Sequence, residues 1–234
     1  MMPDYALQKE IIIDKIAQLW QSVSPEQLNR LKREMTLKTF KKNEPIYKEA
    51  DKPSNLLCLI DGKVKVHKSC INGRNIIIRT IKPIEFLGYR AMITGESHRT
   101  SAIAFEDSTI AEFPEELIKN LIEENSDVAM YFMNHLATLL GISDELLVNH
   151  TQKHIRGRLA ETLLSLKNKY GMEADGQTLC ANLSREDLAK MSNMTTSNAI
   201  RTLSAFAGEG IISIDGKNIT ICDIDKLIST STLG

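Results

Sequence analysis

A change in hydrophobic period along the chain constrains the fold more than any other feature of the sequence. From about Leu37 to Phe113 the period is two, as in residues 62–68, where Val64 and Val66 alternate with polar side chains. Such alternation indicates half-buried strands. Many short strands with turns at this spacing predict a barrel-like or jelly-roll β domain. On both sides of this stretch apolar residues recur at helical spacing instead.

Two residue pairs inside the alternating stretch predict β-hairpin turns. They are Asp61-Gly62 and Asn72-Gly73, and both suit a turn whose two central residues prefer positive φ. Further strands are expected at residues 76–81, 99–105 and 109–113.

Helices are expected before and after the strands. Residues 5–20 have an amphipathic pattern, and the segment from Ser24 to Gln27 begins a second helix with a capping box. Residues 125–127 then cap a long helix that extends to about His154.

The long helix carries an apolar stripe that favours a seam between two subunits. The alternative is that the stripe packs only on its own β domain. Gly157, which follows the helix, is the expected hinge. The stripe consists of Phe132, Leu136, Leu139, Leu140, Leu147 and His150.

The C-terminal part predicts three helices followed by a hairpin. The helices are expected at residues 158–170, 185–191 and 196–207, and two alternating runs then flank an Asp215-Gly216 turn. This order is typical of a winged helix-turn-helix. The sequence therefore predicts an α+β chain with three parts: a β-roll sensor domain with its N-terminal helices (1–124), a dimerisation helix and hinge (125–156), and a winged helix-turn-helix (157–234).

The helix that begins at Thr195 has the chemistry of a DNA-reading helix. Ala199, Leu203 and Phe206 recur at helical spacing and are expected to face the core. Arg201 can make a bidentate contact with guanine. The alternative is a plain solvated helix face. The other side chains expected on the outer face are Thr196, Ser197, Asn198 and Thr202, and those expected to hold the DNA backbone are Arg185, Lys190 and Lys217.

Composition excludes several classes of protein. Residues 155–234 carry nine basic and nine acidic residues, which counts mildly against a strong nonspecific binder of nucleic acid. Four scattered cysteines form no C-x-x-C pair, so neither zinc nor an iron–sulfur cluster is expected. We find no phosphate loop or hydrolase motif and expect no enzyme. No apolar run approaches membrane-spanning length and no signal peptide is evident, so a cytoplasmic location without membrane contact is expected.

The order of these parts resembles the Crp/Fnr family of regulators across nearly the whole chain. The motifs that carry the resemblance are Phe86-Leu87-Gly88, Arg99-Thr100-Ser101-Ala102, Gly157-Arg158-Leu159-Ala160, and Ser184-Arg185-Glu186-Asp187-Leu188-Ala189 with Arg201 after it. The resemblance implies a homodimer that binds double-stranded promoter DNA and RNA polymerase, with an effector held in each β-roll. It places the effector beside Gly88, Tyr89, Arg90, Arg99 and Thr100.

The chain also departs from the family pattern. Cyclic-nucleotide-binding members have a glutamate after the turn glycine, but here Tyr89 and Arg90 follow Gly88, so cyclic AMP is not expected. Thr196 and Ser197 stand where arginine and glutamate often begin the reading helix, so the operator is expected to differ from the best-known one.

These departures are compatible with the HcpR-like branch, which implies haem and nitric oxide as signals in a nitrosative-stress response. His150 and Met133 are the expected haem ligands. The alternative for each histidine is a structural role in the long helix. The alternative function is a cyclic-nucleotide-like sensor that acts through protein partners, with a degenerate DNA domain. The wider set of candidate ligands is Met92, Met130, Met133, His135, His150, His154 and Cys58.

Overall fold

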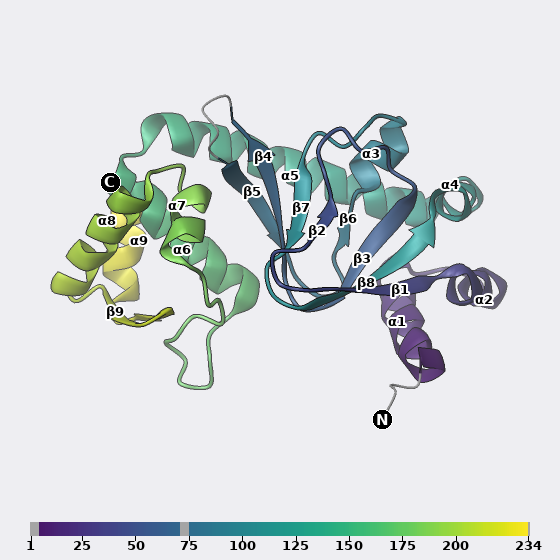
Figure 1. Cartoon of the computed structure of the whole chain (residues 1–234), viewed down its shortest axis with the longest axis horizontal. Coiled ribbons are helices and arrows are strands. Elements are labelled where there is room, and N and C mark those ends of the chain that lie inside the picture. The colour runs from purple at the N-terminus through teal and green to yellow at the C-terminus, as the bar shows by residue number, and fades with distance from the viewer. Residues whose placement is uncertain (1–4, 71–74, 234) are drawn as a thin grey trace. The chain divides into compact units, whose positions relative to one another are not determined.

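The computed structural model describes residues 5–70 and 75–233, except for the side chains of Tyr5, Ala6, His150 and Leu233. The chain divides into two compact units. The first comprises residues up to Ser69 together with Ile78–Gly141, and the second comprises Cys70–Ile77 together with Ile142–Gly234. Figure 1 shows the elements of each unit along the chain. The division into three parts at residues 124 and 156 remains a prediction.

The first unit begins with α1 (Tyr5–Trp20) and α2 (Pro25–Glu34), as expected. The predicted capping box at α2 is confirmed. Ser24 Oγ accepts a hydrogen bond from the Gln27 backbone N–H at 3.2 Å, and the Gln27 side-chain oxygen accepts one from the Ser24 N–H at 3.0 Å. Two of the unpaired N–H groups at the start of the helix are thereby satisfied.

Two four-stranded sheets follow, with the orders β1-β8-β3-β6 and β2-β7-β4-β5. The pairing of β1 with β8, β3 with β8, and β4 with β7 is antiparallel. This arrangement confirms the jelly-roll β domain predicted from the alternating pattern (Figure 1). The strands are β1 (Thr36–Phe40), β2 (Pro45–Tyr47), β3 (Asn55–Asp61), β4 (Val64–Ser69), β5 (Asn75–Ile81), β6 (Phe86–Leu87), β7 (Ser101–Ala104) and β8 (Ser108–Pro114).

The prediction of a hairpin at Asp61-Gly62 is wrong. β3 and β4, which flank this pair, belong to different sheets, so the turn carries the chain from one sheet to the other. Gly62 has a φ of +88°, and a Cβ there would lie 2.5 Å from the Asp107 carbonyl oxygen. The glycine is thus required by the close approach of another backbone segment. The second predicted pair, Asn72-Gly73, lies outside the described residues.

The core of the first unit gathers around Trp20, which is 1% exposed. Its ring stacks on Phe86 with centroids 5.2 Å apart and approaches Phe132 at 5.9 Å. Three further helices contribute side chains to this core. They are α3 (Tyr89–Thr94), α4 (Glu115–Glu124) and the long α5 (Ser126–Gln152). Phe132 is buried, so the part of α5 that carries it packs on its own β domain.

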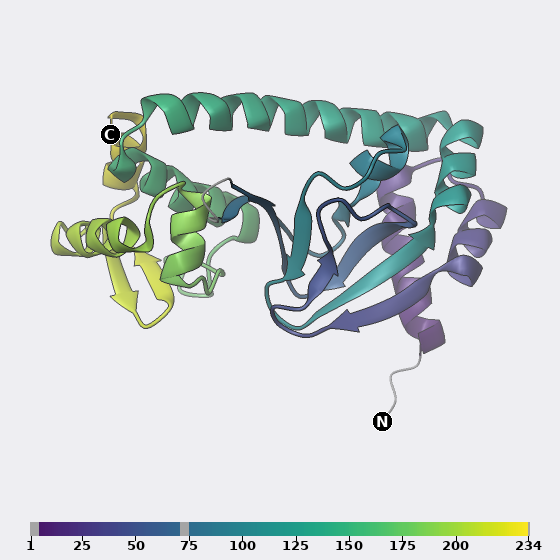
Figure 2. The same ribbon diagram turned by 45° about the horizontal axis from the view of Figure 1, so that its top comes forward.

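The second unit contains the predicted helices and hairpin (Figure 2). The hinge expected at Gly157 stays a prediction. Gly157 is a buried residue in the first turn of α6, which begins at Ile155. A last helix, which the sequence pattern did not indicate, packs on α6. The elements are α6 (Ile155–Tyr170), α7 (Arg185–Met191), α8 (Thr196–Gly208), β9 (Ile212–Asp215), β10 (Asn218–Ile221) and α9 (Ile224–Leu233).

Candidate nucleic-acid interface and sensor site

The turn between α7 and α8 is built from local backbone chemistry. Asn193 has a φ of +48°, a left-handed conformation that asparagine tolerates. The Met194 N–H donates to the Ala189 carbonyl at 3.0 Å. Thr195 then caps α8, since its side-chain oxygen accepts from the Asn198 N–H at 3.2 Å. The turn therefore sets where α8 begins, as the sequence predicted.

Arg158 of α6 donates hydrogen bonds to the backbone of this turn. Its Nε donates to the Ser192 carbonyl at 3.0 Å, and its Nη2 donates to the Asn193 carbonyl at 3.2 Å. Ser192 also donates from its hydroxyl to Thr162 Oγ1 at 2.8 Å in a buried contact. The angle at which α7 leads into α8 thus depends on polar contacts with α6.

The outer face of α8 differs in part from the sequence prediction. Thr196, Ser197 and Arg201 are exposed, while Thr195 and Asn198 are half-buried. Thr202 is buried at 8% exposure, so its expected place on the outer face is wrong. Helical spacing explains this, because Thr202 lies one turn before the buried Phe206. Ile200, which the sequence reading did not consider, is 47% exposed.

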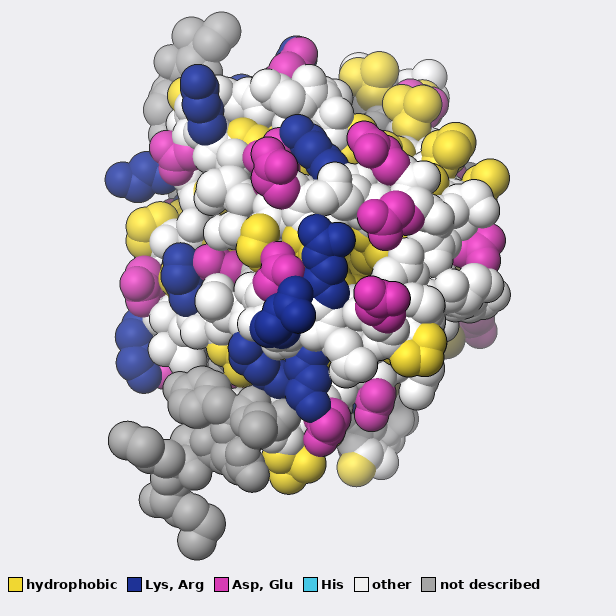
Figure 3. Space-filling model, turned by 90° about the vertical axis from the view of Figure 1, so that its right-hand side faces the viewer, with side chains coloured by type: hydrophobic (Ala, Val, Ile, Leu, Met, Phe, Trp, Pro, Cys, Tyr) yellow, Lys and Arg dark blue, Asp and Glu magenta, His cyan; other side chains and the backbone are white. Residues whose placement is uncertain are grey.

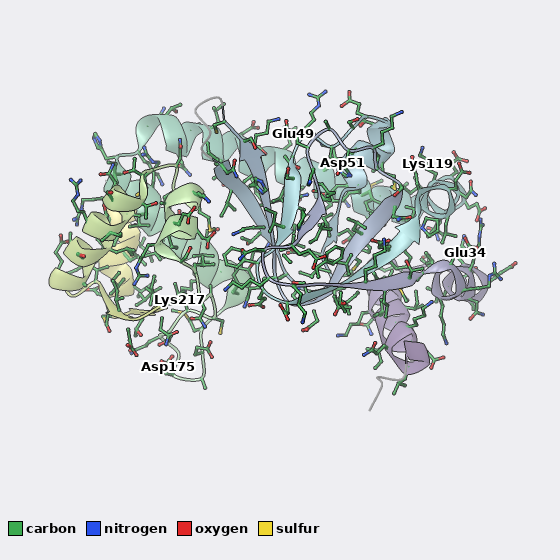
Figure 4. All side chains as sticks on the ribbon, viewed as in Figure 1. Glu34, Glu49, Asp51, Lys119, Asp175 and Lys217 are labelled. Carbon is green, nitrogen blue, oxygen red and sulfur yellow. The ribbon has the colours of Figure 1, made fainter. Side chains whose placement is uncertain are left out.

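The hairpin of β9 and β10 forms a wing that Arg185 connects to α7. The Arg185 Nη2 donates to the Gly216 carbonyl at 2.8 Å. One nitrogen of this guanidinium is therefore already hydrogen-bonded to the wing. Lys217 is exposed at the tip of the wing (Figure 4). Lys190 pairs with Glu186 at 2.6 Å. Among the three cations expected to hold the DNA backbone, Lys217 is the one without an ion pair or hydrogen bond within the described structure.

The effector site expected from the sequence is centred on Gly88, which has a φ of +83° and is the N-cap residue of α3. Tyr89 is 1% exposed, and its hydroxyl accepts a hydrogen bond from Arg79 Nη1 at 3.2 Å. Its ring lies against Phe132 and His135 of α5, with centroids 5.7 and 5.5 Å apart. Sequence reasoning missed Arg79, because β5 and α3 meet only in the folded domain.

A second aromatic residue extends this group. Tyr47 stacks on His98 with ring centroids 3.9 Å apart. Burial raises the pKa of the Tyr47 hydroxyl, whereas Thr100, Arg79 and Arg90 act to lower that pKa. Arg90 and Thr100 therefore lie near the Tyr47 hydroxyl, as Arg79 does.

Arg99 does not join this group. It is exposed and pairs with Glu96, to which Nε and Nη2 donate at 3.2 and 2.9 Å. The cationic groups around Tyr47 and Tyr89 come instead from β5 and α3.

The expected haem ligands, Met133 and His150, both belong to α5. Met133 is 57% exposed on α5, and the side chain of His150 lies outside the described residues. Burial raises the pKa of the Cys58 thiol to about 12, which disfavours the thiolate that binds metals. Within residues 5–70 and 75–233, no group of three or more His, Cys, Asp or Glu side chains is arranged to hold a metal ion.

The face of the first unit shown in Figure 3 carries charges of both signs, with a band of Lys and Arg through its centre and Asp and Glu around it. On α2, Arg30 pairs with Glu34 at 3.4 Å, and on α4, Lys119 pairs with Glu115 at 2.6 Å. As far as the described chain extends, its helices include none that is long and apolar enough to cross a membrane.

Two known domains match the chain. Residues 37–125 match the cyclic nucleotide-binding domain, and residues 157–230 match the Crp-like helix-turn-helix domain. The fold and the site together define a DNA-binding transcription regulator with a sensor domain, and not an enzyme. The chain belongs to the Crp/Fnr family, as its motifs and domain order predicted.

Curated relatives and solved structures agree with this assignment. The CRP-like cAMP-activated global transcriptional regulator of Mycobacterium tuberculosis is 21% identical over 90% of this chain and 95% of its own length. The global nitrogen regulator of Nostoc is 25% identical over 79% of this chain and 84% of its own length. The structure of FixK2 from Bradyrhizobium japonicum is similar with a TM-score of 0.77 and 21% identity, over 84% of this chain and 96% of that one.

Proposed function

We propose that this chain is a homodimeric, effector-gated regulator that reads promoter DNA with α8 and thereby acts on RNA polymerase in the cytoplasm. The observation that carries the proposal is the exposed face of α8, where Thr196, Ser197 and Arg201 project from a helix held in place by Arg158. The first turn of such a helix approaches base edges in the major groove. A degenerate DNA domain, the alternative from the sequence, is disfavoured by these intact features.

Arg201 supplies the strongest base contact in this proposal. A guanidinium can donate two hydrogen bonds to guanine O6 and N7. Thr196 and Ser197 read neighbouring bases or hold phosphates, while Lys217 contacts the backbone from the wing. Arg185 has a positioning role, because its hydrogen bond to the Gly216 carbonyl fixes the wing against α7.

The homodimer is supported by a second exposed feature. Met133, Leu140 and Leu147 follow one another at intervals of seven residues on α5, and they are 57%, 65% and 66% exposed. Apolar residues at this period form the seam of a two-helix coiled coil. Phe132, Leu136 and Leu139 pack on the protein's own core instead. The seam therefore contains Leu140 and Leu147 of the stripe seen in the sequence, together with Met133.

The effector is expected to carry an anionic group. Arg79 and Arg90 both act on Tyr47, and neither has a carboxylate partner within the described residues. Cyclic AMP remains an unexpected ligand, although a relative is described as cAMP-activated. The buried Tyr89 fills the position after Gly88, and Arg99 is engaged by Glu96 outside the group.

Haem that responds to nitric oxide is the second candidate signal, in line with the HcpR-like branch. His135 supports it, because its ring stacks on Tyr131 at 6.1 Å beside the buried Tyr89. Histidine is one of the side chains that ligate haem iron. Titration with hemin tests this candidate: a Soret shift that disappears in His135→Ala supports it, and the absence of any shift contradicts it.

Chromatin immunoprecipitation from the native cells tests the DNA-reading function. We expect one enriched sequence motif that purified protein retards in a gel, and loss of that preference in Arg201→Ala. The absence of a motif, or an unchanged preference in Arg201→Ala, would contradict the proposal. For the dimer, Leu140→Glu is expected to halve the mass measured by light scattering, while Leu7→Glu, a change at a position of α1 that is 57% exposed, leaves the mass unchanged.

A further inference from the structure

Ile200 is an apolar side chain in the middle of a polar reading surface. It lies between the buried Ala199 and the exposed Arg201, and 47% of it is exposed. Across the described part of α6 to α9, the large apolar side chains exposed to this degree are Ile200 and Ile228. A single exposed isoleucine is ordinary on a protein surface. Its position on α8 is what gives Ile200 significance.

The neighbours of Ile200 leave it uncovered. Residues three and four positions away on a helix are neighbours. Of these, Thr196, Ser197 and Ser204 are exposed, while Leu203 is buried. The three exposed residues are shorter than isoleucine, so the Ile200 side chain stands above them. α8 contains no acidic residue from Thr196 to Gly208, so nothing on this face repels a duplex.

One apolar group is available in the major groove to meet such a side chain. The C5-methyl group of thymine is the apolar element of the base edges there, and cytosine lacks it. The χ1 angle of isoleucine is strongly restricted in a helix, so the position of the side chain is set before DNA arrives.

We infer that Ile200 is a specificity-determining residue that contacts a thymine methyl group in the operator, close to the guanine read by Arg201. This inference rests on the proposed insertion of α8 into the major groove. It adds an apolar contact to a reading set that otherwise consists of hydrogen-bonding side chains. The operator is then expected to hold a thymine within about one or two base pairs of that guanine.

Replacing thymine with deoxyuridine tests the contact, because it removes the methyl group and leaves base pairing unchanged. The probe is the operator recovered by chromatin immunoprecipitation, with each thymine replaced in turn. The protein is the full chain from cells in which the operator is occupied. We expect about fourfold weaker binding by the wild type at one position of each half-site, the effect of one methyl-sized apolar contact.

A mutant cycle assigns that effect to Ile200. The variant Ile200→Ala is expected to bind the thymine and deoxyuridine operators equally. The control is Ile228→Ala on α9, since Ile228 is also 47% exposed and should retain the wild-type fourfold ratio. Light scattering on Ile200→Ala is expected to give the wild-type mass.

Three outcomes would overturn the inference. They are equal binding of every deoxyuridine operator by the wild type, a thymine preference that survives in Ile200→Ala, and a change of mass in Ile200→Ala, which would place the residue at a protein contact. In these cases the enriched motif and its loss in Arg201→Ala still support the proposed function. If no motif is recovered at all, the proposed function fails and this inference fails with it.

Discussion

Arg158 donates a hydrogen bond from its Nε to the Ser192 carbonyl at 3.0 Å and connects α6 to the turn before α8. The same guanidinium reaches the Lys153 carbonyl at 2.9 Å and the Asn193 carbonyl at 3.2 Å. One side chain thus joins the backbone just before α6 to two carbonyl groups in the turn between α7 and α8. The orientation of α8, the helix proposed to read DNA, thus depends on a residue that is not itself expected to contact DNA.

We expect Arg158→Ala to lower the free energy of unfolding by about 2 kcal/mol, because three carbonyl groups lose a charged donor. DNA affinity should fall as well, since α8 loses its support. Urea denaturation and gel retardation measure the two effects. Arg99→Ala is the control, and its exposed pair with Glu96 should change stability by less than about 0.5 kcal/mol. Equal stability of the two variants would contradict the supporting role of Arg158.

Arg201 and Lys217 should respond differently to substitution. Arg201→Ala is expected to cost about 1–3 kcal/mol for the preferred operator and to relax the preference at one base step. Lys217→Ala should weaken binding to all sequences alike and reduce the slope of log affinity against log salt by about 1. Binding titrations over a range of salt concentrations separate these effects. A sequence-dependent loss in Lys217→Ala would assign the wing a reading role.

Gly62 and Gly95 allow a matched comparison of two glycines with positive φ. A Cβ at Gly62 would lie 2.5 Å from the Asp107 carbonyl oxygen, whereas a Cβ at Gly95 has no neighbour within 4 Å. Gly95→Ala should therefore cost only the conformational strain of about 1–2 kcal/mol. Gly62→Ala adds a backbone clash and should cost at least about 3 kcal/mol. Thermal unfolding measures both, and similar costs would show that the loop before β8 can move away.

His98 should make the stability of the sensor domain depend on pH. Burial against Tyr47 lowers the pKa of His98 below its ordinary 6.5, with a smaller lowering by Arg90, while Asp51 opposes both. As the pH falls below 6.5, the unfolded chain therefore binds the proton before the folded chain does. The folded state loses stability over this range and regains it as the pH rises.

The variant His98→Gln should flatten this dependence, because glutamine does not titrate. Urea denaturation at about pH 7.5 and about pH 5.5 compares the two proteins across the range in which histidine titrates. An equally steep loss of stability in His98→Gln would assign the effect to another group.

Local chemistry made much of the second unit predictable from the sequence. The start of α8 follows from the Thr195 cap, and the wing follows from the Asp215-Gly216 turn between two alternating runs. Both depend on residues that are neighbours along the chain. The burial of Thr202 and the exposure of Ile200 also follow from the helical period of about 3.6 residues.

The sensor site was less predictable because its contacts are long-range. Arg79 and Tyr89 meet only after β5 has been placed beside α3. In the same way, the Asp61-Gly62 pair favours a turn, but the sheet that receives the next strand depends on the closure of the whole β domain. Arg99 matched a family motif, but its side chain is exposed and pairs with Glu96.

The position of Trp20 has a practical consequence. It is the only tryptophan in the sequence, and its ring stacks on Phe86 and approaches Tyr131 within the core of the first unit. Intrinsic tryptophan emission therefore comes from the sensor domain alone. An effector that rearranges the rings around Tyr89 can therefore be followed by the emission of Trp20, without a label. In the same sample, a dye-labelled DNA duplex can be used to measure binding by α8.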